Sequence, residues 1–206
     1  MLVIGLTGGI GTGKSTVAGI LAEGGALLLH ADVVGHEAYL PHLNVWQEVV
    51  DAFGRGILNE KDEVVRARLG EIVFKDPAAL KRLNAIVHPW IYQRMEQLIA
   101  GLREKNTAVA VLEAALLFEA GWTPLVDQIW ITHAPEASVL ERLQKRNGLT
   151  PEQITERIRA QMPATERLKG ADVVVDTEGS LADVRAQVSQ LWKLHVVPTL
   201  PSVAKG

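Results

Sequence analysis

The 206-residue sequence has no cysteine, which excludes disulfide bonds and thiol chemistry. It also has no excess of basic residues, since its formal net charge is −3, so we expect neither nucleic acid nor a membrane as a partner. Its longest apolar run, residues 108–118, contains Glu113 and is shorter than the roughly 20 residues that span a bilayer. No basic, cleavable leader is visible, so we expect a cytoplasmic protein. As a separate expectation, the protein is a monomer or a weak homo-oligomer.

Short apolar segments alternate with helical patterns along the whole chain. Because 48% of the residues are hydrophobic, the chain can form a buried core. The apolar segments predict five strands, at residues 2–7, 26–30, 108–112, 128–132 and 173–175. Uninterrupted apolar strands between helices are typical of parallel sheets that are buried on both faces. This pattern predicts an α/β three-layer sandwich with a parallel five-stranded sheet, with ligands bound at the carboxyl ends of the strands.

Helical patterns fill the segments between these strands. Helices are predicted at residues 14–23, 135–147, 151–161 and 181–194, with a long helical region at about 33–101 that is broken at Pro41, Gly54–Gly56, Pro77 and Pro89. The last residues, "PTLPSVAKG", predict a loose tail. No change in composition marks a linker, so we expect a single domain over residues 1–206.

Five glycines occur in the nine residues from Gly5 to Gly13, directly before Lys-Ser-Thr. The segment from Gly8 to Ser15 fits G-x-x-x-x-G-K-[ST], the phosphate-binding loop of P-loop NTPases, between a predicted strand and a predicted helix. Successive N–H groups there turn inward around a phosphate, and β-carbons would obstruct them. Lys14 provides a positive charge, and the Ser15 hydroxyl suits Mg²⁺. We expect a nucleoside triphosphate to be bound by Gly8, Gly9, Ile10, Gly11, Thr12, Gly13, Lys14, Ser15 and Thr16.

Two carboxylates follow predicted strands. Asp32 stands just after the second strand, where it could cap the next helix, or orient an acceptor hydroxyl and take its proton. Glu113 ends the third strand, where it could hold Mg²⁺ through water or pair with a nearby cation. Both alternatives stay open for each residue.

Four arginines are predicted on two successive helices. Arg142 and Arg146 are four residues apart on one face, and Arg157 and Arg159 follow in the next helix. A solvated charged face is the simpler interpretation, and a flap that brings arginines onto the transferred phosphate is the alternative. Arg66 and His88 lie in the long helical region and are weak signals alone. The five tryptophans are scattered and favour core positions.

Together, several segments resemble the dephospho-CoA kinase family, in the family's order and over nearly the whole chain. They are "IGLTGGIGTGKSTVA", "HADVVGHEAY", "VVRARLGEIVF" with "LNAIVHPWI", "EAALLFEAGW", "ERLQKRNGLTPEQITERIRAQMP" and "ADVVVDTEGS". The resemblance implies transfer of the ATP γ-phosphoryl group to the ribose 3′-hydroxyl of dephospho-CoA, with Mg²⁺. It implies a core of residues 1–32, 103–134 and 164–195, an acceptor-binding helical insertion at about 33–102, and a lid at about 135–163.

The resemblance also implies roles for single residues. Asp32 falls on the family's catalytic aspartate, and Lys14 and Arg142 join it as catalytic residues. Arg142 and Arg146 fall on the lid arginines that bind ATP, and Arg66 and His88 are assigned to the acceptor side.

The chain departs from the family pattern at His30, His36, Ala115 and Thr177. His30 replaces a carboxylate, whereas the phosphate loop, Asp32 and the lid arginines are all present.

Three other functions are weighed against this one. Another small-metabolite kinase would share the scaffold and differ in the helical insertion. A GTP-dependent switch protein would carry an N/T-K-x-D motif, and none occurs in the sequence. A non-catalytic nucleotide-binding protein would not need Lys14, Ser15 and Asp32 together.

Overall fold

The structure is a computed structural model and describes residues 1–200. These residues form two compact units, one of residues 30–98 and one that joins residues 1–29 to the chain from Ile99 onward. We call them the helical unit and the sheet unit, and describe each by itself. Among the helices of residues 1–200, none combines the length and the apolarity that crossing a bilayer would require.

The sheet unit contains a five-stranded parallel sheet in the order β2-β3-β1-β4-β5. Its strands are β1 (Leu2–Gly8), β2 (Leu27–His30), β3 (Val109–Glu113), β4 (Gln128–His133) and β5 (Val173–Asp176). The central strand β1 pairs in parallel with β3, with Leu6 opposite Glu113, and with β4, with Gly8 opposite Thr132. All five predicted strands are therefore confirmed. This register brings the end of β1 beside Glu113 and Thr132.

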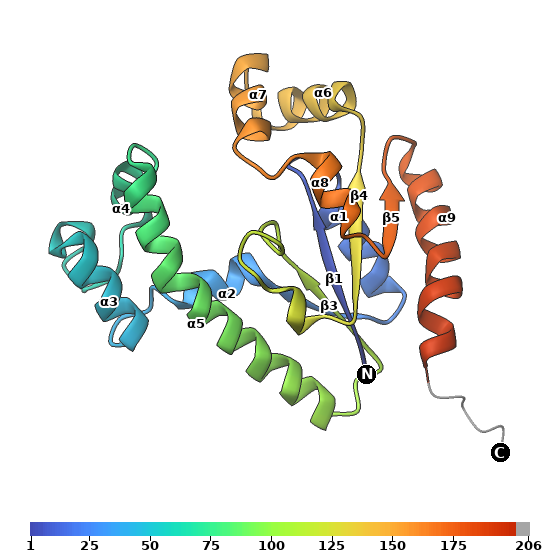
Figure 1. Cartoon of the computed structure of the whole chain (residues 1–206), viewed down its shortest axis with the longest axis horizontal. Coiled ribbons are helices and arrows are strands. Elements are labelled where there is room, and N and C mark those ends of the chain that lie inside the picture. Colours follow the sequence, from blue (N-terminus) through green and yellow to red (C-terminus); the bar gives the residue numbers. More distant parts are fainter. Residues whose placement is uncertain (201–206) are drawn as a thin grey trace. The chain divides into compact units, whose positions relative to one another are not determined.

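Helices cover the sheet on both faces (Figure 1). On one face, α1 (Lys14–Glu23) and α9 (Leu181–Leu191) pack beside each other over the main apolar core, which includes Ile4, Val17 and Trp130. On the other face, α8 (Ala164–Lys169) contacts β4. Between β4 and α8 the chain forms α6 (Glu136–Asn147) and α7 (Pro151–Arg159). The predicted α/β sandwich with its parallel sheet is confirmed.

The edge strands differ from the prediction of burial on both faces. Strands β1 and β3 are buried throughout, and β4 is buried at Trp130, Ile131 and Thr132. In contrast, β2 is exposed or half-buried at all four positions, and β5 alternates buried and exposed residues. The reason is position, because each edge strand has a neighbour on one side only. Strand order is a property of the tertiary fold. The apolar residues 27–29 therefore do not reveal that β2 is an edge strand.

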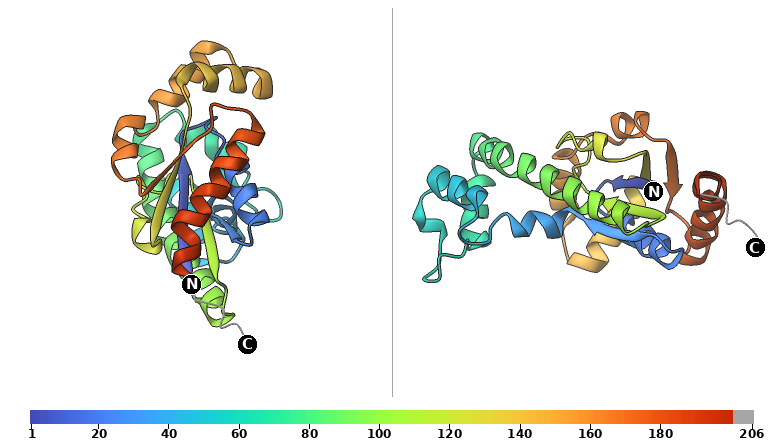
Figure 2. Two further views of the ribbon diagram at one scale, coloured as in Figure 1. Left: turned by 90° about the vertical axis from the view of Figure 1, so that its right-hand side faces the viewer. Right: turned by 90° about the horizontal axis from the view of Figure 1, so that it is seen from below.

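The helical unit is formed by α2 (Ala31–Glu37), α3 (Asn44–Phe53), α4 (Arg66–Val73) and α5 (Pro77–Glu104), whose last residues extend into the sheet unit. The predicted break at Pro89 is wrong, because Pro89 lies inside α5, which continues for 28 residues. Within this unit the side chain of Arg94 forms an ion pair of 3.0 Å with Glu37 and links α5 to α2. Figure 2 shows the same helices from two further sides.

Two other segments differ from the sequence prediction. The short helix α8 was not predicted at all. The sequence predicts that the last helix ends at residue 194, whereas α9 ends at Leu191. The chain then forms a π-helix over Trp192–Val196 and a 3₁₀ turn over Val197–Thr199. Of the predicted loose tail, residues 201–206 lie outside the described part of the chain.

Candidate active site

The turn between β1 and α1 has little room at its start and a left-handed backbone at its end. A β-carbon added to Gly8 would lie 2.1 Å from Thr132 Oγ1, so no larger residue fits there without displacing β4. Gly13, the N-cap of α1, has a φ of 80° and offers no side chain to the first N–H groups of the helix. Those unpaired donors are therefore available to an anion, as the phosphate-loop pattern predicts.

A cavity of about 250 Å³ opens above this turn. It is lined by all nine predicted phosphate-binding residues, from Gly8 to Thr16, and by Ala115, Arg146 and Gln161. The lining thus includes four glycines, which expose only backbone, and the cationic side chains of Lys14 and Arg146, which suits a polyphosphate.

Lys14, Ser15 and Glu113 meet at the edge of this cavity. One carboxylate oxygen of Glu113, Oε1, accepts a hydrogen bond of 3.1 Å from Lys14 Nζ and one of 2.9 Å from Ser15 Oγ. The side chains of Lys14 and Glu113 are only 16% and 8% exposed, so this ion pair is largely shielded from water. Of the two interpretations of Glu113, pairing with a nearby cation is therefore observed.

The same residues are chemically suited to Mg²⁺. A hydroxyl and a carboxylate beside a phosphate site supply the hard oxygen ligands that Mg²⁺ takes, in company with phosphate oxygens and water. Within residues 1–200, no group of three or more acidic, histidine or cysteine side chains is placed to hold a metal alone. The donor set thus fits a metal that arrives with a nucleotide.

The two arginines of α6 lie in different surroundings. Arg146 lines the phosphate-loop cavity. Arg142 donates to the side-chain and carbonyl oxygens of Thr177, at the end of β5, and the Thr177 hydroxyl donates in turn to the carbonyl oxygen of Thr12 at 2.8 Å. Thr177, one of the departures from the family pattern, therefore connects Arg142 to the phosphate loop. In α7, Arg157 and Arg159 are both exposed.

The remaining predicted site residues belong to the helical unit. Asp32 is exposed and is the second residue of α2, whose N-cap is His30, so the capping interpretation of Asp32 is wrong. Arg66 begins α4, and its charge opposes the rise that burial causes in the pKa of Tyr39. His88 is half-buried in α5, and burial lowers its pKa, which favours the neutral imidazole near pH 7. Arg66, His88 and Asp32 thus come from three different helices of one unit.

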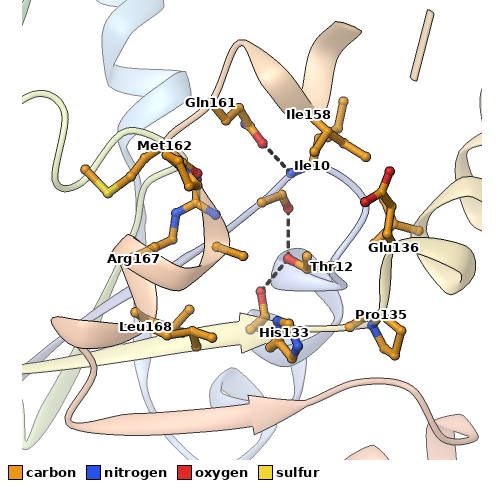
Figure 3. Close-up of a pocket in the computed structure, with 17 residues that line it drawn as sticks. Ile10, Thr12, His133, Pro135, Glu136, Ile158, Gln161, Met162, Arg167 and Leu168 are labelled. Atoms are coloured by element: carbon orange, nitrogen blue, oxygen red, sulfur yellow. Dashed lines mark hydrogen bonds between the residues drawn. The ribbon is translucent and has the colours of Figure 1, made fainter. Parts of the chain in front are cut away.

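Three residues that the sequence did not single out lie against the phosphate loop, and Figure 3 shows one of them, Gln161, bound to Ile10. Gln161 Oε1 accepts a hydrogen bond of 2.8 Å from Ile10 N–H, and the Thr132 and Thr12 hydroxyls lie 2.8 Å apart. Arg167 is 4% exposed, and burial lowers its pKa while Glu119 opposes this effect. No sequence signal identifies Gln161 or Arg167, because each lies more than 140 residues from the loop. Thr132 could have been found, since it ends a predicted strand.

Comparisons with known proteins show the family of the chain. The profile of the family described as dephospho-CoA kinase matches residues 2–183. A dephospho-CoA kinase from Carboxydothermus hydrogenoformans is 43% identical over 194 residues, which cover 93% of this chain and 94% of that protein.

Two solved structures are also similar over almost their full lengths. A protein from Thermus thermophilus has a TM-score of 0.76 at 35% identity, and the match covers 94% of this chain and 97% of that one. A dephospho-CoA kinase from Campylobacter jejuni has a TM-score of 0.73 at 26% identity and covers 96% and 98%. The family profile spans the phosphate loop, both predicted carboxylates and both α6 arginines, and the chain belongs to the dephospho-CoA kinase family.

Proposed function

We propose that the protein transfers the γ-phosphoryl group of ATP to the ribose 3′-hydroxyl of dephospho-CoA and releases coenzyme A and ADP, the final step of coenzyme A synthesis. One observation carries the proposal: the dephospho-CoA kinase profile matches residues 2–183, and within that range every residue from Gly8 to Thr16 lines one polar cavity. The family membership supports the acceptor, and the cavity supports the nucleotide.

On the donor side, the phosphate loop binds the triphosphate of ATP. Backbone N–H groups at the start of α1 are the anion donors, and the helix dipole adds to them. Lys14 turns from Glu113 toward the outer phosphates and neutralises the charge that develops on them. Ser15 and, through water, Glu113 would hold Mg²⁺, which when bound neutralises phosphate charge and orients the oxygens.

On the acceptor side, Asp32 is the proposed general base. Its carboxylate accepts the proton of the ribose 3′-hydroxyl while that oxygen bonds to the γ-phosphorus and the bond to the ADP oxygen breaks. We assign dephospho-CoA binding to the helical insertion at about residues 33–102, with Arg66 providing positive charge and neutral His88 a polar contact.

The segment of about residues 135–163 is the proposed lid. Arg146 already lines the phosphate-loop cavity, and Arg142 is the other arginine of the same helix. Both are assigned to ATP, where they stabilise the transferred phosphoryl group and help to exclude water, which would otherwise compete as the acceptor.

An ADP-release assay tests the function. The wild-type protein should release ADP from ATP with dephospho-CoA and should not do so with nucleoside monophosphates. Lys14→Ala should lower the turnover by about a hundredfold or more, because it removes a cation that stabilises charge in the transition state. If the wild-type protein released no ADP with dephospho-CoA, the substrate assignment would be wrong, and turnover with a nucleoside monophosphate would favour the alternative kinase.

A further inference from the structure

The peptide group that joins Gly9 to Ile10 is hydrogen-bonded at both ends. Its carbonyl oxygen accepts from Thr12 Oγ1 at 2.8 Å, inside the phosphate loop. Its N–H donates to Gln161 Oε1 at 2.8 Å, and Gln161 lies in the short segment between α7 and α8 (Figure 3). The first bond connects residues three positions apart within the loop, whereas the second connects residues 151 positions apart. Turning this peptide group over would therefore break a contact at each end.

Gly9 gives this peptide group more conformational freedom than another residue would. Gly9 follows Gly8, and a glycine has no β-carbon to restrict its dihedral angles. The Gly9 carbonyl also accepts the N–H of Thr12 at 3.3 Å and so closes the first turn of the loop. A loop that binds phosphate through backbone N–H groups has to hold them in one orientation. Each alternative orientation of the loop lowers the fraction of protein molecules that can bind phosphate.

Gln161 is well placed to restrict this freedom, because the residue after it is fixed. Met162 N–H donates to Glu119 Oε1 at 3.4 Å, and the Met162 carbonyl accepts from Arg167 at 2.9 Å. Arg167 and Glu119 lie 3.8 Å apart as an ion pair, and the Arg167 guanidinium is buried next to the loop, 3.3 Å from where a β-carbon of Gly9 would be. Both polar backbone groups of Met162 are thus bound to side chains, which fixes the start of the Gln161 side chain.

We propose that Gln161 is a positioning residue that holds the Gly9–Ile10 peptide group in its nucleotide-binding orientation. Its amide oxygen accepts a hydrogen bond from Ile10 N–H, and Thr12 Oγ1, which belongs to the loop itself, donates to the Gly9 carbonyl oxygen. The bond preorganises the loop before ATP arrives, so that less ordering is lost on binding. The kinetic part of this inference rests on the proposed function, whereas the effects on the loop itself do not.

The experiment replaces Gln161 by methionine, which has a similar length and no amide oxygen. The matched control is Gln144→Met, the same exchange at an exposed position of α6. In the nucleotide-free protein, the amide hydrogen of Ile10 should exchange about three- to tenfold faster in Gln161→Met, which is the usual range for one lost hydrogen bond. The KM for ATP should rise by a similar factor while kcat stays within about twofold, and Gln144→Met should match the wild type.

Gln161→Asn is a second variant, in case the methionine protein folds poorly. It keeps the amide but is one methylene shorter, so it should lose the bond and raise the KM for ATP in the same way. Unchanged Ile10 exchange together with an unchanged KM in Gln161→Met would overturn the inference, and so would equal changes in Gln144→Met. Neither the amide hydrogen exchange of Ile10 nor the rise in melting temperature that ATP causes requires an acceptor substrate. They test Gln161 even if wild-type protein is inactive with dephospho-CoA, a result that would overturn the proposed function alone.

Discussion

Gly8 is the residue of the phosphate loop with the least space around it. An added β-carbon would lie 2.1 Å from Thr132 Oγ1, 2.7 Å from Thr12 Oγ1 and 2.8 Å from the Thr132 carbonyl oxygen. Gly8→Ala should therefore separate the hydroxyls of Thr132 and Thr12 and push β1 away from β4. Such overpacking should lower the free energy of unfolding by about 1–3 kcal/mol. We expect urea unfolding to show this loss, and ATP to stop raising the melting temperature.

A glycine of the helix that follows is the control. Gly19 lies inside α1, and a β-carbon there would have no atom within 4 Å. Gly19→Ala should stabilise the protein by about 0.5–1 kcal/mol, since alanine has the higher helix propensity. A Gly8→Ala protein as stable as Gly19→Ala, with an intact response to ATP, would contradict the crowding at Gly8.

At the residue scale, the sequence predicts those site residues that are neighbours along the chain. The nine residues from Gly8 to Thr16 could be predicted because they are consecutive in the sequence, and they line one cavity. The partners of that turn could not be predicted, because Gln161 and Arg167 approach it only after the chain has crossed the sheet. For the same reason, the sequence could not show that Arg142 binds Thr177 while Arg146 lines the cavity.

The start of α7 is fixed by a reciprocal pair of hydrogen bonds. Thr150 Oγ1 accepts from Gln153 N–H at 3.4 Å, and Gln153 Oε1 accepts from Thr150 N–H at 3.1 Å. Thr150→Ala removes the first of these bonds and should destabilise the helix by about 1 kcal/mol. Helix α7 contacts α6 through Ile154, which packs with Val139 and Leu143. We expect the loss of the cap to appear as faster amide exchange across residues 151–159, whereas amide exchange in β1 stays unchanged.

The control is the other threonine of the same helix. Thr155 Oγ1 donates to the Pro151 carbonyl at 2.9 Å, an interaction that competes with the helical backbone and does not cap it. Thr155→Ala should leave exchange in α7 equal or slower, because alanine favours the helix. Equal acceleration by both substitutions would argue against a specific role of the Thr150 cap.

At the scale of whole elements, local pattern predicted the strands and tertiary position decided the exceptions. The five strands were found because each is an apolar run that ends in polar residues or glycine. The exposure of β2 depends on its place at the sheet edge, which its own residues do not encode. Pro89 was expected to end a helix, yet the turns on either side of it keep α5 continuous. The six residues of α8 were too few to give a periodic pattern.

For the whole molecule, the two compact units separate the proposed nucleotide-binding residues from the proposed acceptor-side residues, and Asp32, which the resemblance assigned to the core, lies in the helical unit. All residues that line the phosphate-loop cavity belong to the sheet unit, whereas Asp32, Arg66 and His88 belong to the helical unit. ATP binding should therefore be separable from acceptor activation by substitutions confined to one unit. The sequence suggested this division only through family resemblance, since no linker marks either boundary.

Asp32→Asn tests this separation, because asparagine keeps the shape of the side chain and cannot accept the hydroxyl proton. We expect kcat for ADP release to fall about 10²–10⁴-fold, the usual contribution of a general base, while the ATP-induced rise in melting temperature stays that of the wild type. Asp51→Asn is the matched control, an exposed position of α3 in the same unit, where the side-chain oxygen can still accept from Gln47. Unchanged turnover in Asp32→Asn would remove Asp32 from the mechanism. A lost response to ATP would instead show that Asp32 contributes to the nucleotide site, and that the two units do not bind their substrates independently.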